Sequence, residues 1–192
     1  MIILGIDPGS RTTGFAIVEA ESFKQPATHQ SRRKPSSGAP YRHINHGVIA
    51  MDVKVTFHER IRQLGQGIRQ VIAKYDPDFV VIEKIFMGRN ADSAFKLGHA
   101  RGVVMYEALL NESQVVEYAT RSVKKGIGGT GAATKEEVSL ALSRLLNIPE
   151  IKRLDASDAL ALAIFHATRM SHLEDLSIAS CQGSEICGRM NL

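Results

Sequence analysis

The chain has 192 residues, of which 44% are hydrophobic, so it is long enough for one domain with a substantial core and too short for two comfortable ones. No apolar run approaches the roughly 18 residues of a membrane span, and the N-terminus lacks the basic flank of a secretory signal, so we expect a cytoplasmic protein. The net charge of +4 is mild, and the two cysteines, Cys181 and Cys187, are too few for a zinc site and are expected to be free thiols.

The N-terminal part of the chain predicts three strands. Residues 2–7 and 13–20 are apolar runs joined by a turn sequence that contains Pro8 and Gly9, which predicts a hairpin. The segment from about residue 22 to residue 40 has several prolines and few large apolar side chains, so it cannot bury enough surface to order itself and is expected to be a flexible loop. A third strand is expected over residues 44–51.

A helix and a buried strand come next. Between Phe57 and Tyr75 the apolar residues recur at intervals of three and four, which predicts one apolar face of a helix, and Asp76-Pro77 stops that helix. Residues 79–82 are apolar on both faces, which predicts an interior strand covered by helices on each side. A second helix is expected over residues 92–110, and residues 115–118 predict a fifth strand.

The C-terminal part predicts two further helices. Residues 126–131 are rich in glycine and are expected to form a mobile loop, after which the capping box of Thr134 and Glu137 starts a helix that ends near Asn147. The last helix is expected from Asp155 to Met170, with a disordered tail over residues 171–192. This order of elements is that of the ribonuclease H-like fold, an α/β fold with a five-stranded mixed sheet flanked by helices, here in one domain over residues 1–170. Order alone is also compatible with other α/β topologies.

Four acidic residues stand at element ends that this fold would bring together. Asp7 ends the first predicted strand, Glu83 ends the fourth, and Asp155 and Asp158 share one face at the start of an apolar helix. Carboxylates in such places are unfavourable unless they are solvated, paired or bound to a cation, so the pattern predicts the metal site of a two-metal nuclease. The simpler alternatives are a turn residue for Asp7, an exposed strand-end acid for Glu83, and N-terminal capping by Asp155 and Asp158.

Basic side chains are concentrated close in sequence to these acids. A polyanionic substrate would need such cations to hold it against a negatively charged site, while the alternative for each residue is a solvated surface position. The basic residues are Lys24, Arg32, Arg33, Lys34 and Arg42 in and after the predicted loop, Lys84, Arg89, Lys96 and Arg101 after the fourth strand, and Arg121, Lys124 and Lys125 after the fifth. Of these, Arg89, Lys96 and Arg101 are predicted DNA contacts.

Three stretches of the chain resemble the RuvC family of bacterial Holliday-junction resolvases. The first is GIDPGSR at residues 5–11, and the last is DASDALA at residues 155–161. The middle one comprises IEKIFM at residues 82–87, NADSA at 90–94 and KLGHARG at 96–102, and it is the most specific of the three. The resemblance extends from Met1 to about Arg169.

The resemblance implies a homodimeric endonuclease that nicks two strands of like polarity in a four-way DNA junction during recombination and repair. It further implies a partner of the RuvAB type, a branch-migration motor, and two Mg²⁺ ions in each active site, for which Mn²⁺ would substitute. The acidic tetrad that it implies as metal ligands is Asp7, Glu83, Asp155 and Asp158.

The resemblance also implies roles for an aromatic residue and two lysines. Phe86 would pack against bases near the crossover, although a place in the protein core is the alternative for a lone phenylalanine after a strand. Lys124 and Lys135 would lie near the scissile phosphate and offset the charge that develops there. Independently of the resemblance, Lys135 opposes the helix dipole in the first turn of its helix, so we expect it to face another group.

Two segments depart from the family pattern, and parts of the sequence are also compatible with other functions. The segment at about residues 22–40 is longer than the usual hairpin connection, and the tail after Ser171 has no counterpart. A kinase-like or actin-like ATPase also opens with a strand, an aspartate and a glycine turn, but it needs a second lobe for which this chain is too short. A related nuclease that cuts structured RNA, or a junction-binding module without catalysis, are the remaining alternatives.

One helix offers a candidate dimer surface. A junction presents two equivalent phosphates related by a two-fold axis, so an enzyme with one site per subunit needs two copies with matching symmetry. Gly98 and Gly102 lie one turn apart and would let a partner helix approach, with Val103, Met105, Leu109 and Leu110 nearby.

Overall fold

The computed structural model describes residues 1–20, 40–84 and 91–187, with side chains described as far as Ser171. Its five strands are β1 (Ile2–Asp7), β2 (Thr12–Ala20), β3 (Tyr41–Ala50), β4 (Phe79–Glu83) and β5 (Gln114–Tyr118), in the spatial order β3-β2-β1-β4-β5. The β1–β2 and β2–β3 pairs are antiparallel, and β4 lies parallel to both β1 and β5. The predicted mixed sheet is therefore confirmed, with each predicted strand within a few residues of its observed bounds.

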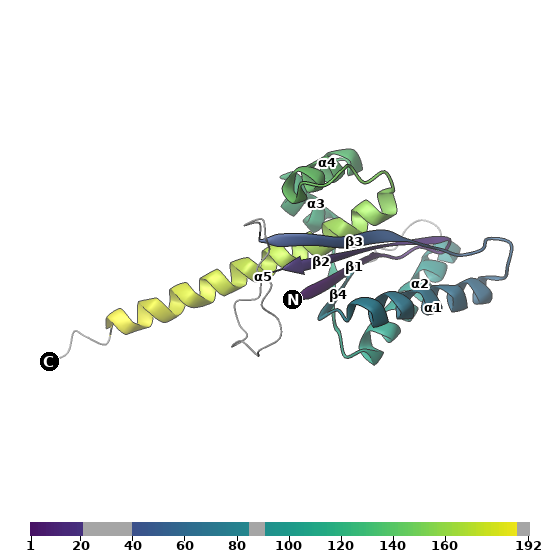
Figure 1. Cartoon of the computed structure of the whole chain (residues 1–192), viewed down its shortest axis with the longest axis horizontal. Helices are drawn as coiled ribbons and strands as arrows, with labels where there is room; N and C mark the ends of the chain where they lie inside the picture. Colours follow the sequence, from purple (N-terminus) through teal and green to yellow (C-terminus); the bar gives the residue numbers. More distant parts are fainter. Residues whose placement is uncertain (21–39, 85–90, 188–192) are drawn as a thin grey trace.

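Helices cover both faces of this sheet (Figure 1). They are α1 (Phe57–Tyr75), α2 (Ala91–Leu110), α3 (Thr120–Gly128), α4 (Lys135–Leu146) and α5 (Leu154–Cys187). Leu4 and Ile6 of β1 pack with residues of α1 and α2 in one core cluster, whereas Ile3 packs with residues of α5 on the other face. β1 is therefore buried on both faces in the middle of the sheet, with helices above and below it. Its last residue, Asp7, lies at the end of this central strand.

Three predicted helix boundaries have local physical causes in the structure. Thr56 caps α1 by accepting a hydrogen bond from the Glu59 amide, and Asp76 ends the helix in the left-handed conformation, with φ 44°. The capping box predicted at Thr134 and Glu137 starts α4, where both of its reciprocal hydrogen bonds form.

The α5 helix lies directly on the backbone of two strands because glycines leave room for it. A Cβ atom added at Gly5 of β1 would stand 2.0 Å from the carbonyl oxygen of Ala159. One added at Gly14 of β2 would stand 2.0 Å from the carbonyl oxygen of Asp155. These contacts are too short for any side chain, so the start of α5 is held against the ends of β1 and β2 that adjoin Asp7.

Two predictions about the C-terminal part differ from the structure. The mobile loop predicted over residues 126–131 begins inside a helix that we did not predict, α3, which continues to Gly128 and ends at Gly129 with φ 78°. The residue that precedes this helix, Ala119, makes no side-chain capping bond, so the usual start signal is missing. The last helix was predicted to end near Met170, but α5 continues to Cys187, because no proline interrupts residues 155–187.

Several other expectations fall on residues outside the described ones. The flexible loop predicted over residues 22–40 lies almost wholly there, as do Phe86 and Arg89 and the side chains of Cys181 and Cys187. The division into a domain over residues 1–170 and a tail stays a prediction. In the described part of the chain, no helix is both long and apolar enough to cross a membrane.

Candidate functional site

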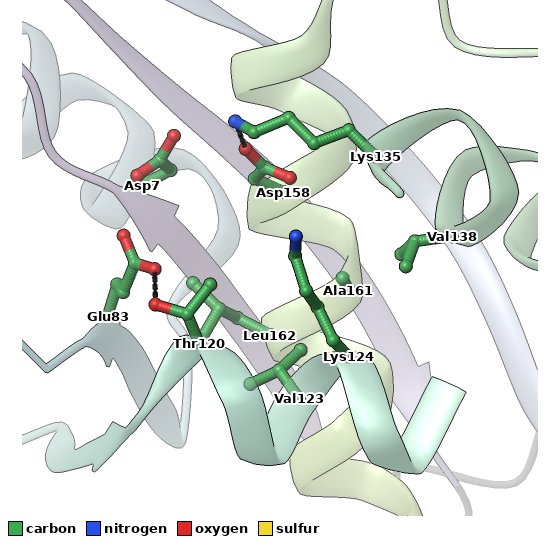
Figure 2. A pocket seen from close by; sticks show the side chains of 10 residues that line it. All are labelled: Asp7, Glu83, Thr120, Val123, Lys124, Lys135, Val138, Asp158, Ala161 and Leu162. Atoms are coloured by element: carbon green, nitrogen blue, oxygen red, sulfur yellow. Dashed lines mark hydrogen bonds and ion pairs between the residues drawn. The ribbon is translucent and has the colours of Figure 1, made fainter. Parts of the chain in front are cut away.

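A pocket lies at the ends of β1 and β4, where the N-terminal turns of three helices converge (Figure 2). Its polar wall comes from five elements of the chain, and buried or partly buried apolar side chains of α3, α4 and α5 form the remainder. The lining residues are Asp7, Glu83, Thr120, Val123, Lys124, Lys135, Val138, Asp158, Ala161 and Leu162.

Strand order explains why the acids meet. Asp7 is the last residue of β1 and Glu83 is the last residue of β4, and these neighbouring strands run parallel, so both carboxylates leave the same edge of the sheet. Asp158 reaches the same place from α5, which the glycine contacts hold on β1 and β2. Asp155 does not line the pocket, but its charge is close enough to raise the pKa of Asp7.

Three hydrogen bonds hold the loop that follows Asp7. The Arg60 guanidinium of α1 donates a hydrogen bond to the Ser10 carbonyl oxygen, at 2.8 Å, and stands over the Phe57 ring. The amide of Met51 donates to the Arg11 carbonyl oxygen at 2.9 Å, and the buried Thr13 hydroxyl accepts from the Gly9 amide. These bonds limit the freedom of the backbone that carries Asp7.

Two of the pocket carboxylates have protein partners. The Lys135 ammonium forms an ion pair with Oδ2 of Asp158, and the Thr120 hydroxyl donates a hydrogen bond to Oε1 of Glu83. The expectation that Lys135 faces another group is therefore confirmed, and that group is a pocket carboxylate. Figure 2 shows the Lys124 side chain extending from α3 into the same pocket.

The pocket carries an excess of negative charge. Burial, followed by repulsion from the carboxylates of Glu83, Asp158 and Asp155, raises the pKa of Asp7 from 3.8 to about 8, although Lys135 opposes the shift. Burial tends to lower the pKa of Lys135, but its hydrogen bond to Asp158 and the charges of Asp158, Asp7 and Glu83 outweigh burial and raise it. A further cation at this place would relieve the repulsion among the acids.

The donor set fits a hard divalent cation. Carboxylate oxygens are the ligands that Mg²⁺ and Mn²⁺ prefer, and the lining residues that the structure describes include no cysteine or histidine that would favour zinc. As they stand, no three His, Cys, Asp or Glu side chains within the described ranges are close enough together to hold one ion. The contacts of the pocket acids agree with this separation: Lys135 holds the Asp158 carboxylate in one place, and Thr120 holds the Glu83 carboxylate in another.

Metal-free protein is expected to lose stability relative to the Asp7→Asn variant as the pH rises from about 4 to about 8. In this interval the unfolded chain has released the Asp7 proton while the folded chain still binds it, so each added pH unit favours unfolding. The effect is at most about 1.4 kcal/mol per pH unit, reduced by water that reaches this partly exposed side chain. Urea unfolding in a metal chelator at several pH values measures it; parallel pH profiles of the two proteins would contradict the expectation.

The predicted DNA contacts have varied surroundings. Lys96 pairs with Asp92 one helical turn away, at 2.5 Å, on the outside of α2. Arg101 forms an ion pair with Glu117 of β5, and only 19% of its side chain is exposed, so its guanidinium is already engaged within the protein. Both roles stay predictions. Among the predicted basic residues that the structure describes, Lys124 and Lys135 line the pocket.

Sequence reasoning missed Thr120. It is the first residue of α3, and that helix lacks a capping signal at its start. Its place follows from a contact between distant segments: Tyr118, at the end of β5, is paired with Glu83, so Thr120 begins α3 beside the Glu83 carboxylate.

The chain matches the family described as "Crossover junction endodeoxyribonuclease RuvC" over residues 33–166. It is 53% identical over 170 residues to the crossover junction endodeoxyribonuclease RuvC of Bdellovibrio bacteriovorus, a similarity that covers 88% of this chain and 92% of that protein. It is 40% identical over 176 residues to the protein of the same name from Syntrophotalea carbinolica, covering 92% of this chain and 99% of the relative.

Solved structures of Holliday junction resolvases also resemble this chain. The structure of T. thermophilus RuvC in complex with a Holliday junction substrate superposes with a TM-score of 0.73 at 27% identity, covering 87% of this chain and 93% of that one. The yeast mitochondrial Holliday junction resolvase Ydc2 superposes with a TM-score of 0.61 over 91% of this chain and 82% of its own. At 10% identity, Ydc2 supports the ribonuclease H-like fold alone.

Proposed function

This chain belongs to the RuvC family of crossover junction endodeoxyribonucleases, and on that premise we propose that it resolves four-way (Holliday) DNA junctions by paired symmetric nicks that depend on Mg²⁺. The observation that carries the proposal is the pocket that brings Asp7, Glu83 and Asp158 together with Lys124 and Lys135. Carboxylates that can hold divalent cations, with lysines beside them, can together hydrolyse a phosphodiester.

The four acids are proposed as the ligands of the cations. Asp7, Glu83 and Asp158 present carboxylate oxygens to the pocket, and Asp155 adds negative charge beside it. When bound, Mg²⁺ supplies an activated water and stabilises the leaving oxygen, and Mn²⁺ would substitute for it. The raised pKa of Asp7 supports this assignment, since a carboxyl group surrounded by acids gains from a nearby cation.

The two lysines are proposed to act on the phosphate. Lys135 has an ammonium that already lies in the pocket and is paired with Asp158, so it can serve the scissile phosphate without a large movement of the helix. Lys124 extends into the pocket from α3 (Figure 2). Both positive charges would offset the negative charge that grows on the phosphate in the transition state.

The proposal is tested with a synthetic four-way junction, a linear duplex of the same sequence and a single strand, each with and without Mg²⁺. We expect paired nicks in the junction alone, and only with the metal. Equal cutting of all three substrates, or cutting of a structured RNA in preference to the junction, would overturn the assigned substrate. Tight junction binding without cutting would overturn the assignment as an enzyme.

Lys124→Ala and Lys135→Ala are expected to lower the single-turnover rate at saturating protein by about 10²-fold to 10³-fold each, the range seen when one stabilising group is removed from a site of developing charge. A lysine that only anchors DNA would instead weaken binding and reduce its salt dependence. Lys125→Ala, which removes an exposed neighbour outside the pocket lining, is the matched control. Normal rates for both pocket variants at saturation would contradict their proposed role.

The proposed homodimer uses the exposed face of α2. Of the residues predicted for this surface, Val103 and Met105 are partly buried against the core of their own subunit. The others are exposed, and no atom of the described residues lies within 4 Å of a Cβ atom added at Gly98 or Gly102. The resulting exposed stripe, with helical spacing, consists of Phe95, Gly98, Gly102, Tyr106, Leu109 and Leu110.

Leu109→Glu is expected to convert the dimer into a monomer at micromolar concentration, because 61% of this side chain is exposed in one subunit and a charge there cannot be buried against a partner. Sedimentation velocity measures the change. Leu140→Glu, an exposed leucine on α4, serves as the control and should remain dimeric. A dimeric Leu109→Glu protein would overturn the surface, and a wild-type monomer both free and on the junction would overturn the dimer.

A protein partner and a location in the cell also belong to the proposal. A homodimer has the symmetry that a four-way junction requires, and a branch-migration motor of the RuvAB type would deliver the junction to it in the cytoplasm. Pull-down of the purified dimer with the motor proteins of its own cell, with and without junction DNA, tests the partner directly. Absence of binding in both conditions would overturn it.

A further inference from the structure

Thr120 lies at the mouth of the pocket because of how β4 and β5 end. The two strands are parallel, and Glu83 is paired with Tyr118. The amide of Lys84 donates to the Tyr118 carbonyl oxygen at 2.8 Å, so the strands remain joined one residue beyond Glu83. The chain then turns directly into α3, and its first residue, Thr120, points its hydroxyl at the Glu83 carboxylate (Figure 2).

The α3 helix holds this hydroxyl in a defined place. Val123 is buried in the core cluster that includes α5, and a Cβ atom added at Gly126 would stand 2.4 Å from the Phe165 ring, so α3 packs closely on α5. Thr120 and Lys124 are one helical turn apart and therefore share a face, and both line the pocket. The orientation of α3 thus sets the positions of a hydroxyl and an ammonium at the same time.

The partner of Glu83 differs in kind from that of Asp158. A lysine ammonium neutralises Asp158, whereas the Thr120 hydroxyl is an uncharged donor. An uncharged donor fixes the direction of a carboxylate but leaves its full negative charge available to a cation. The hydrogen bond involves Oε1, so the lone pairs of Oε2 are left to face the pocket.

We propose that Thr120 is a positioning residue that orients the Glu83 carboxylate for binding of the divalent cation. This inference rests on the proposed function of the same pocket. Hydrogen bonds from outside the ligand set commonly account for about 10-fold to 100-fold in metal affinity or activity. The assignment adds a residue to the site whose contact is with a ligand rather than with the substrate or the ion.

Three variants test it. Thr120→Val keeps the shape of the side chain and removes the donor, Thr120→Ser keeps the donor and removes a methyl group, and Ser122→Ala removes an exposed hydroxyl from the same helix outside the pocket lining. Two quantities are measured: the Mg²⁺ concentration at half-maximal junction cleavage, and Mn²⁺ binding to the DNA-free protein by calorimetry. Thermal melts and circular dichroism establish that each variant is folded.

Thr120→Val is expected to raise the Mg²⁺ requirement and weaken Mn²⁺ binding by about 10-fold or more, while Thr120→Ser and Ser122→Ala stay close to the wild type. Wild-type metal dependence in Thr120→Val would overturn the inference. So would a defect that Thr120→Ser shares in full, since the methyl group would then be responsible.

Should Thr120→Val be unfolded, Thr120→Ala takes its place with the same expected outcome. Should the wild type cut no junction, the proposed function fails, and the calorimetric comparison still decides the role of Thr120.

Discussion

Replacing Asp7 with asparagine is expected to slow cleavage of a four-way junction by at least about a thousandfold, with junction binding nearly unchanged. Asparagine keeps the size of the side chain and removes the negative charge that a divalent cation requires. Asp7 ends the central strand of the sheet, and burial together with the neighbouring carboxylates raises its pKa to about 8, so a cation beside it would be stabilised by its ionised form.

Single-turnover cleavage in Mg²⁺ and gel-shift binding in Ca²⁺ separate the two effects on Asp7→Asn. Asp52→Asn, which changes an exposed acid outside the pocket lining, is the control and should cut at the wild-type rate. Cleavage by Asp7→Asn within a few-fold of the wild type would remove Asp7 from the proposed ligand set. Lost cleavage together with lost binding would show instead that Asp7 supports the DNA-binding surface.

Gly14→Ala is expected to reduce the free energy of unfolding by about 3 kcal/mol or more and to abolish cleavage in whatever protein still folds. The added Cβ atom would stand 2.0 Å from the carbonyl oxygen of Asp155 and 2.2 Å from its carbonyl carbon. These are backbone atoms at the start of α5, which cannot turn aside as the end of a side chain can. Relief of the clash must move the helix that carries Asp155 and Asp158.

Urea unfolding and cleavage, measured on the same preparation of Gly14→Ala, test this expectation. Gly131→Ala is the matched control, because the added Cβ atom there meets mainly the side chain of the exposed Arg121, which can move. A Gly14→Ala protein as stable and as active as the wild type would mean that α5 does not approach β2 as closely as described.

Local chemistry made much of the fold predictable from the sequence. The apolar repeat from Phe57 and the stop at Asp76-Pro77 predicted α1, and a complete capping box predicted the start of α4. The three pocket acids could be placed together because parallel strands end at one edge of a sheet and the apolar start of the last helix has to cover it.

The remaining features depend on contacts between distant segments. Arg101 was predicted to contact DNA, yet its partner Glu117 lies on β5, and no local pattern indicates that pairing. The α3 helix starts after Ala119, which supplies no capping side chain, and is held by packing on α5, so its glycine-rich end was predicted to be a loop. Gly5 and Gly14 could be recognised as strand residues, but only the position of α5 explains why they cannot be larger.

The docking of α5 on Gly5 and Gly14 has a consequence for the chain as it is synthesised. Asp7 and Glu83 leave the ribosome long before Leu154, the first residue of α5. A nascent chain that has completed β1 to β5 therefore has two of the pocket acids but neither Asp158 nor the helix that closes the pocket. If the four acids are the ligands, a partly made or prematurely terminated chain cannot cut DNA. The protein can therefore cut DNA only after α5 has been synthesised and has docked on the sheet.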